Sequence, residues 1–370
     1  MANPQSTRPD TKPNDTLPVR RKPVLGITMG DPAGIGPEVI IKALADPAIR
    51  KLARFVVFGM NELLAYAADL AEIDPYWHRL QHDAERATHR LVHDVVVLDY
   101  DEYSMLGSAV AKPTKAGGQA SLRFLDDAIA AARRPIEDNG IDAIVTAPIC
   151  KASWALAGFD RYPGHTELLA ARTRAKRVVM MFDAPQIRVA LATVHLPLMD
   201  VRNVLTIGKV FDAIDLGGHA CRSLGIRHPK IAVTGLNPHA GENGLFGDEE
   251  SRLIEPAIEM AKAAGHDVQG PFPADTLFTP KRLSQFDLFV TMYHDQGLIP
   301  VKMLAFDQAV NVTLGLPIIR TSVDHGTAFD LVGKNVADPG SMKSAICLAA
   351  HLAGNQLAAQ ADAEAAREAS

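Results

Sequence analysis

Short, apolar, β-prone runs alternate with longer helical segments from Pro23 onward, and this alternation constrains the fold more than any other feature. Runs such as 24–28 and 143–146 are followed by segments with apolar residues at helical spacing, of which 117–133 is the clearest. Strands that alternate with helices in this way are typical of a largely parallel sheet covered by helices. The sequence therefore predicts an α/β fold.

The length of the chain predicts more than one lobe. A chain of 370 residues exceeds the usual size of a single domain. No Gly/Ser-rich linker divides it, so we expect two α/β lobes that share the chain discontinuously and enclose a cleft. The first lobe is assigned to residues 23–150 plus 295–370, and the second to residues 151–294. Residues 1–22 contain four prolines and no apolar core of a signal peptide, which predicts a disordered tail.

Composition excludes several classes of function. The net charge is −5, and no dense run of Lys and Arg occurs, which argues against binding to nucleic acid or to a membrane surface. No apolar run is long enough to cross a membrane. The three cysteines are far apart and form no CxxC pair, so we expect neither disulfides nor a thiolate zinc site, and a cytoplasmic location. The histidine-rich stretch 74–94 is interpreted as a solvated face.

Three histidines follow the ends of apolar, strand-like runs. His195 follows 190–194, His239 follows 230–236, and His294 follows 289–293. Three imidazoles at one sheet edge would form an open divalent metal site with room for substrate oxygens. The alternative is that each is a hydrogen-bonded structural residue, because spacing along the chain does not establish that the three rings converge.

A second group of polar residues is suited to a small anion. Its members are Lys302, Arg320, Asn311, His165 and Thr166. A guanidinium presents a planar fork that matches phosphate or carboxylate, and a lysine adds a compact charge. The start of a helix after Gly164 would add backbone N–H groups. The alternative is a set of ordinary surface salt bridges.

Several motifs are specific enough to indicate a family. They are TMGDPAGIGPE (28–38), GHTE (164–167), VALATVHLPL (189–198), GLNPHAGE (235–242), GPFPADTLF (270–278), MYHDQGLIPVK (292–302) and VNVTLGLPIIRTSVDHGTA (310–328). In this order they resemble the 4-hydroxythreonine-4-phosphate dehydrogenases of pyridoxal phosphate biosynthesis. The resemblance covers roughly residues 23–353.

The resemblance implies a fold like that of isocitrate and isopropylmalate dehydrogenases, in a homodimer with active sites at the subunit interface. It also implies one divalent metal ion per site (zinc, magnesium or cobalt) bound by three histidines from both subunits. The first lobe would be the cofactor side, and the second the metal and dimer side. The matching metal positions are His195, His239 and His294; the matching substrate positions are His165, Thr166, Lys302, Asn311 and Arg320.

A looser resemblance concerns the cofactor, NAD or NADP. GDPAGIGPEV (30–39) looks like the GDGIGPEV of isopropylmalate dehydrogenases, and 324–339 is similar to their HGSAPDIAGKGIANP segment, which lies against the adenosine of NAD. The residues that this resemblance places along the dinucleotide are His325, Gly326, Thr327, Ala328 and Asp338. The loop 29–36 fits no GxGxxG or Walker pattern, so taken alone it predicts only a tight strand-to-helix turn.

The activity implied is oxidation of 4-phosphohydroxy-L-threonine to a 3-oxo acid that loses CO₂. Lys151, Asp275 and Asp295 are the candidates for the general base, and the sequence does not choose among them. Phosphorylated four-carbon sugar acids (4-phospho-D-threonate or -erythronate) are an alternative substrate class. Aromatic cis-dihydrodiols are disfavoured, because they carry no phosphate for Lys302 and Arg320. A phosphate acyltransferase is a more remote alternative that would leave the three histidines without a role.

Overall fold

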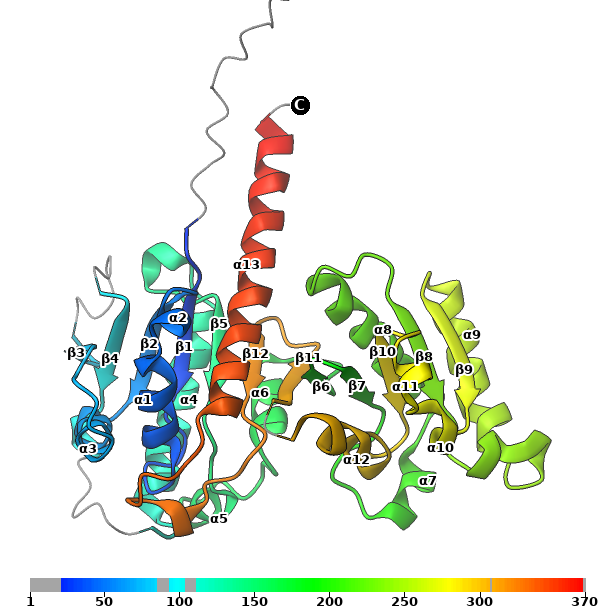
Figure 1. Cartoon of the computed structure of the whole chain (residues 1–370), viewed down its shortest axis with the longest axis horizontal. Helices are drawn as coiled ribbons and strands as arrows, with labels where there is room; N and C mark the ends of the chain where they lie inside the picture. The colour runs from blue at the N-terminus through cyan, green and yellow to red at the C-terminus, as the bar shows by residue number, and fades with distance from the viewer. Residues whose placement is uncertain (1–20, 85–92, 104–110, 307, 369–370) are drawn as a thin grey trace, which may run out of the picture.

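A computed structural model describes residues 21–84, 93–103, 111–306 and 308–368, and in them twelve strands form one sheet (Figure 1). The strand order is β3-β4-β2-β1-β5-β12-β11-β6-β7-β10-β8-β9. The strands are β1 (Val24–Thr28), β2 (Arg54–Gly59), β3 (His78–Gln81), β4 (Val95–Asp99), β5 (Ala143–Thr146), β6 (Val179–Ala184), β7 (Ile187–Leu191), β8 (Lys230–Thr234), β9 (Asp267–Phe272), β10 (Leu288–Thr291), β11 (Val310–Leu314) and β12 (Ile319–Ser322).

Helices connect and cover the strands. They are α1 (Gly36–Ala45), α2 (Pro47–Arg50), α3 (Asn61–Leu70), α4 (Lys115–Ala132), α5 (Lys151–Leu156), α6 (His165–Thr173), α7 (Val201–Val204), α8 (Ile207–Ser223), α9 (Glu255–Ala263), α10 (Ala274–Leu277), α11 (Pro280–Leu283), α12 (His294–Ala305) and α13 (Gly340–Glu368). Short 3₁₀ turns η1 (Asp101–Tyr103), η2 (Ile136–Asp138), η3 (Leu198–Asp200), η4 (Pro238–Gly244) and η6 (Phe329–Leu331), and a π-helical turn η5 (Glu250–Ile254), complete the elements. The predicted α/β fold is confirmed.

Most neighbouring strands are parallel, and the exceptions lie in the middle of the sheet. β11 is antiparallel to both β12 and β6, and β6 is antiparallel to β7. β7 and β10 therefore run opposite to β1 and β5 within the sheet. Three strands were not predicted from the sequence, namely β3 in the histidine-rich stretch, β9 and β12. β12 is only four residues long, too short for a clear alternation of side chains.

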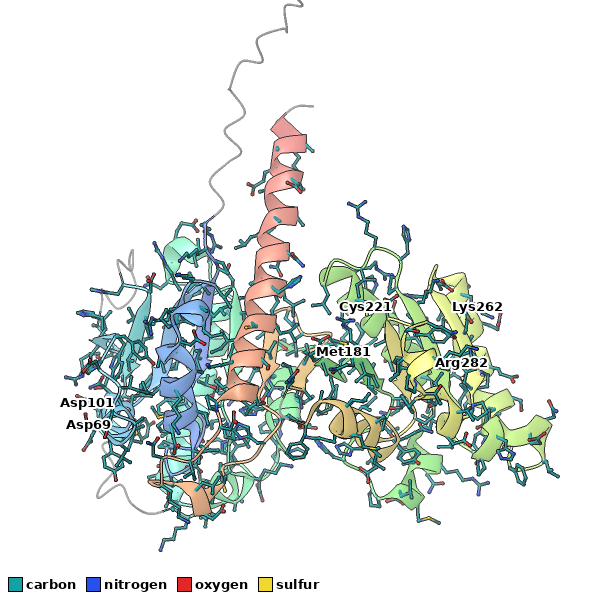
Figure 2. All side chains as sticks on the ribbon, viewed as in Figure 1. Asp69, Asp101, Met181, Cys221, Lys262 and Arg282 are labelled. Atoms are coloured by element: carbon teal, nitrogen blue, oxygen red, sulfur yellow. The ribbon has the colours of Figure 1, made fainter. Side chains whose placement is uncertain are left out.

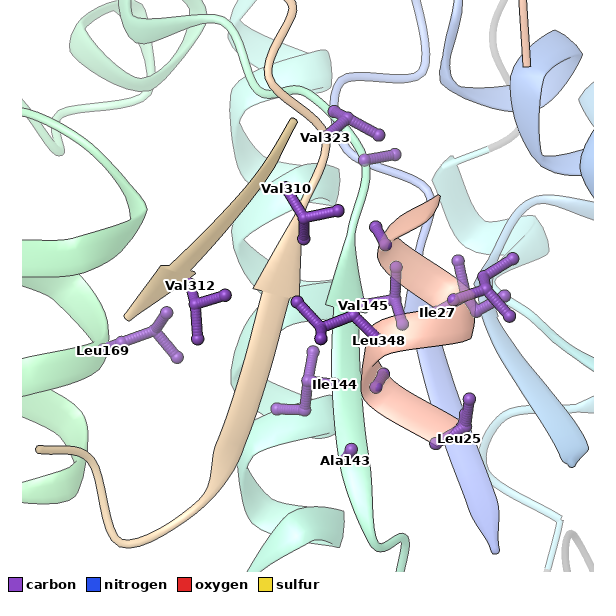
Figure 3. Close-up of a cluster of buried hydrophobic side chains, with 14 of the residues drawn as sticks. Leu25, Ile27, Ala143, Ile144, Val145, Leu169, Val310, Val312, Val323 and Leu348 are labelled. Carbon is purple, nitrogen blue, oxygen red and sulfur yellow. The ribbon is translucent and has the colours of Figure 1, made fainter. Parts of the chain in front are cut away.

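The main core lies between the sheet and its covering helices. Leu25, Ile27, Val145 and Val312 from the strands pack with Leu348 of α13 (Figure 3). A second apolar cluster packs α12 against β7 and β10. Figure 2 shows side chains packed along the whole sheet, with Met181 of β6 near its middle. Close packing on a continuous sheet makes the strand ends a rigid support for polar residues.

Two expectations from the sequence stay predictions. The division into two lobes is one, and the sheet runs without interruption through β11 and β6, which the division separates. The disordered tail is the other, since residues 1–20 lie outside the described residues. In the described part of the chain, no helix is long and apolar enough to cross a membrane.

Candidate active site

The three strand-end histidines follow three neighbouring strands. β7, β10 and β8 lie side by side and run in parallel, so their carboxyl ends share one edge of the sheet. His195 follows β7, His239 follows β8 within η4, and His294 begins α12 directly after β10. The ring centroids of His195 and His294 are 5.7 Å apart. The structure thus brings two of the three predicted metal ligands together.

A buried hydrogen bond fixes that pair. The Thr193 hydroxyl donates to the Met292 carbonyl oxygen at 2.7 Å, and each of these residues lies two positions before a histidine of the pair. His195 itself has a positive φ of 39°, an unusual backbone conformation for a residue with a side chain. Such strain is often found where neighbouring groups position a functional side chain.

The protonation of these rings suits a metal ligand. Nδ1 of His294 lies 2.7 Å from Asp295 Oδ1, and Nδ1 of His239 lies 3.1 Å from Glu242 Oε2. A carboxylate on Nδ1 leaves Nε2 as the nitrogen with the free lone pair. Burial lowers the pKa of His195, which keeps the imidazole neutral. The donor set therefore fits a divalent metal ion, with Asp295 orienting one ligand.

The third histidine, His239, lies in a segment with exposed apolar side chains. Among the described residues, no three His, Cys, Asp or Glu side chains are grouped closely enough to hold a metal ion. His239 packs edge-on against Phe246, with ring centroids 5.8 Å apart. The neighbouring Leu245 is 73% exposed. The segment that carries His239 thus presents an apolar surface to its surroundings.

Arg320, on β12, is a buried cation. Its guanidinium donates to Thr313 Oγ1 at 2.9 Å and to Thr146 Oγ1 at 2.7 Å, and its Nε has no hydrogen-bond partner among the described residues. Burial lowers the pKa of Arg320 to about 9, opposed by the Glu167 carboxylate. The residue is 3% exposed, and its hydrogen-bond partners among the described residues are hydroxyls and not a carboxylate, which is a costly environment for a cation.

Other polar atoms of the predicted substrate-binding residues are also buried without partners among the described residues. His165 begins α6, packs edge-on against Trp154, and has a buried Nε2 without a partner in the described part of the chain. Burial, and then the charge of Arg320, holds the pKa of His165 well below its usual value. Oδ1 of Asn311 is likewise buried without a partner, and Thr166 is buried beside His165. These are residues that the sequence assigned to the substrate, and their unpartnered polar atoms suit a polar ligand.

Lys302 lies on α12 and is already paired. Its ammonium contacts the Asp324 carboxylate and lies 4.9 Å from the centroid of the Phe306 ring. Burial raises the pKa of Asp324, while Lys302, His325 and His294 pull it down. Lys302 and His294, one of the candidate metal ligands, therefore both act on Asp324, which is itself the first residue of the candidate cofactor segment.

Charged residues that follow β5 affect the pKa of a histidine that follows β7. Lys151, at the start of α5, lowers the pKa of His195, and Glu167 of α6 raises it. Glu167 also acts on Arg320. In Figure 1, α5, α12 and α7 all lie along the lower side of the molecule. The same carboxylate, Glu167, therefore acts on one of the strand-end histidines and on Arg320.

The three candidate bases have different surroundings. Lys151 is exposed and lies near His195, and Asp295 contacts His294. Asp275 is exposed on α10, which packs against the η4 turn of His239. Asp295 already orients the His294 imidazole. Lys151 and Asp275 are therefore the two candidate bases that are not occupied in orienting one of the three histidines.

The candidate cofactor segment packs on the Gly-rich loop. The Ile35 N–H donates to the Thr327 carbonyl at 3.0 Å, and a Cβ on Gly34 would lie 2.9 Å from Thr327 Cβ. Nε2 of His325 is buried without a partner among the described residues, and Ala328 has a φ of 41°. Beside the segment, a small cavity of about 40 Å³ is lined by Ile35, Leu63, Tyr66 and Val332, among others.

The remaining two candidates of that segment differ. A Cβ on Gly326 would meet no atom within 4 Å, so its backbone is open to a ligand. Asp338 Oδ1 accepts the Gly340 N–H at 2.6 Å at the start of α13, which is a structural role. Glu167 and Asp324 were not predicted as site residues, although both lie inside the family motifs. Their proximity to Arg320 and Lys302 arises only in the folded chain.

Solved structures of similar fold indicate the class of protein. A 4-hydroxythreonine-4-phosphate dehydrogenase from Klebsiella pneumoniae matches with a TM-score of 0.77 and 39% identity, over 90% of this chain and 99% of that one. A terephthalate 1,2-cis-dihydrodiol dehydrogenase from Burkholderia xenovorans matches with a TM-score of 0.60 and 28% identity, over 90% and 98%. The fold is thus similar to that of two dehydrogenases, which are oxidoreductases.

Sequence comparison defines the family. The model of the pyridoxal phosphate biosynthetic protein PdxA matches residues 51–349. A 4-hydroxythreonine-4-phosphate dehydrogenase from Desulforapulum autotrophicum is 44% identical over 89% of this chain and 95% of its own length. A D-threonate 4-phosphate dehydrogenase from Cupriavidus necator is also 44% identical, over 90% and 97%. The chain belongs to the PdxA family, as its motifs predicted.

Proposed function

We propose that this protein oxidises 4-phosphohydroxy-L-threonine with NAD or NADP to 2-amino-3-oxo-4-phosphooxybutanoate, which decarboxylates to 3-amino-2-oxopropyl phosphate, in pyridoxal 5'-phosphate biosynthesis. One observation carries the proposal. The Arg320 guanidinium and the His165 Nε2, which has no partner among the described residues, are both buried. The Glu167 carboxylate acts on Arg320 and also on His195, whose ring lies 5.7 Å from that of His294. A substrate with a phosphate at one end and a hydroxyl near the metal would reach both the buried cation and the histidine pair.

The residues of this chain have distinct roles in the proposed reaction. Arg320, His165 and Thr166 bind the phosphate, and Lys302 exchanges its contact with Asp324 for the substrate. A divalent metal ion, when bound, supplies Lewis acidity at the substrate hydroxyl, while the nicotinamide accepts the hydride. Asp275 from the His239 side, or Lys151 after it has released its own proton and reacts as the neutral amine, accepts the hydroxyl proton. Burial of the pocket excludes water and strengthens each of these contacts.

We further propose a homodimer in which His239 completes the site of the partner. The supporting observation is the apolar surface around the histidines: Met199 is 85% exposed, Met303 is 82% exposed, and Leu245 lies beside His239. Exposed apolar side chains gathered around an incomplete polar site are typical of a protein interface.

Mixed dimers test the shared site. Variants His239→Ala and Arg320→Met are expected to be inactive alone. When they are mixed and allowed to exchange subunits, heterodimers contain one intact site, so about a quarter of wild-type activity should return (half heterodimers, one of two sites intact). If activity stays absent although exchange is shown by mass spectrometry, the two residues do not serve one shared site.

4-Phospho-D-threonate is the second candidate substrate, because a relative named for it is as similar as one named for the first. Side-by-side kinetics on the two substrates, with NAD and with NADP, decide between them. The assay follows formation of the reduced cofactor by absorbance, with and without a chelator. Release of thiol from an acyl-CoA without formation of reduced cofactor would instead support a phosphate acyltransferase.

A further inference from the structure

The turn that carries His239 has an unfavourable backbone conformation. Residues 239–243 all have positive φ, between 45° and 81°, and only Gly241 among them is a glycine. Residues with a side chain rarely adopt this left-handed region, and almost never in succession. Such a turn persists only where the surrounding structure holds it.

A buried carboxylate lies directly against this turn. Glu250 is 4% exposed, and its Oε1 accepts the backbone N–H groups of Leu236 at 2.8 Å and Asn237 at 2.7 Å. Its Oε2 accepts from Asn237 Nδ2 at 2.9 Å, and Glu249 accepts from the same amide at 2.8 Å. A Cβ on Gly241 would lie 2.7 Å from Glu250 Oε2. Glu250 therefore binds the chain before the turn and supports the turn itself.

The same segment is tied to the strand end that carries His294. Gln296 donates to the Gly235 carbonyl at 2.8 Å, and its Oε1 accepts the Met292 N–H at 2.7 Å and the Thr234 hydroxyl at 2.9 Å. The entrance of the His239 turn is thus clamped between Gln296 and Glu250. Glu250 begins the π-helical turn η5, an irregularity that is frequent at functional sites.

We infer that Glu250 is a positioning residue that holds His239 in place for a divalent metal ion and thereby sets the affinity of the metal site. This inference rests on the proposed function. A carboxylate suits the position because three N–H donors converge on it. A glutamine at position 250 would direct its own N–H group at one of these donors and lose that hydrogen bond. The turn would then change conformation and displace the His239 imidazole.

The test uses the full-length protein and Co²⁺ as the probe. Co²⁺ affinity is measured from its visible absorption bands, without substrate, for wild type, Glu250→Gln and Asn237→Ala. Loss of a direct outer-shell partner of a metal ligand lowers affinity by about 10- to 100-fold. Glu250 acts on His239 through residues 236 and 237, so we expect a loss at the lower end, about tenfold, for Glu250→Gln and a smaller loss for Asn237→Ala. Glu255→Gln, the same substitution at an exposed position of the adjoining helix, should leave Kd and unfolding temperature unchanged.

Two outcomes overturn the inference. The first is a folded Glu250→Gln variant that binds Co²⁺ as tightly as wild type. The second, decisive if Glu250→Gln does not fold, is an unchanged Kd in Asn237→Ala. His239→Ala separates this inference from the proposed function. If His239→Ala itself binds Co²⁺ normally, the proposed metal site is wrong; if it weakens binding while Glu250→Gln does not, only the role of Glu250 is wrong.

Discussion

Replacing Arg320 by methionine is expected to remove phosphate binding without lowering the stability of the protein. The fall of the Arg320 pKa from the ordinary value of an arginine to about 9 corresponds to roughly 5 kcal/mol of unfavourable burial free energy in the ligand-free protein. Its hydrogen bonds go to the Thr146 and Thr313 hydroxyls, and the Glu167 carboxylate opposes the shift without a hydrogen bond to it among the described residues. Methionine fills a similar volume without charge. We therefore expect Arg320→Met to unfold at the same temperature as wild type or higher, although a buried side chain has been replaced.

The same substitution should remove phosphate binding. Loss of one partner of a buried, hydrogen-bonded charge pair costs about 2–5 kcal/mol, so kcat/KM should fall by roughly 10²- to 10³-fold. A saturating phosphorylated substrate analogue should raise the unfolding temperature of wild type by a few degrees, since 100 times Kd stabilises by about 2.7 kcal/mol, and should not stabilise the variant. The interpretation of Arg320 as a phosphate-binding cation would be refuted by an Arg320→Met variant that is strongly destabilised and whose unfolding temperature rises with the analogue as much as that of wild type.

Three further substitutions test other parts of the structure. His165→Gln should remove a pH dependence: the lowered pKa of His165 means that the unfolded chain takes up the proton first, so wild type should lose about 1.4 kcal/mol more than the variant between pH 7.5 and pH 5.5 in urea unfolding. Gly30→Ala, at φ 74° with a backbone carbonyl in the way, should lower the urea midpoint clearly, whereas Gly208→Ala in a first helical turn should not; equal midpoints would contradict the packing. Lys302→Met should raise KM for the phosphorylated substrate about tenfold or more, and an unchanged KM would remove Lys302 from the binding site.

The secondary structure could largely be predicted from local patterns. β1, β5 and β11 coincide with the expected runs, and α6 begins at His165, where the break after Pro163 predicted a helix. β12 was missed because four residues carry too little periodicity, and its position between β5 and β11 depends on pairing with distant segments. The burial of Arg320, which lies on β12, could therefore not be predicted from the sequence.

The sequence by itself determined which residue types are present and where strands end, because apolar runs and helix-start residues act locally. It thus indicated His195, His239 and His294 and the cations Lys302 and Arg320. Only the tertiary structure decided which of them meet. Because β11 and β6 pair antiparallel with their neighbours, strands in the two halves of the sheet run in opposite directions. Each strand is also rotated by roughly 20° relative to the next, and this twist accumulates across the sheet. Contacts across such distances in sequence depend on the packing of the whole sheet, and local preference carries no information about them.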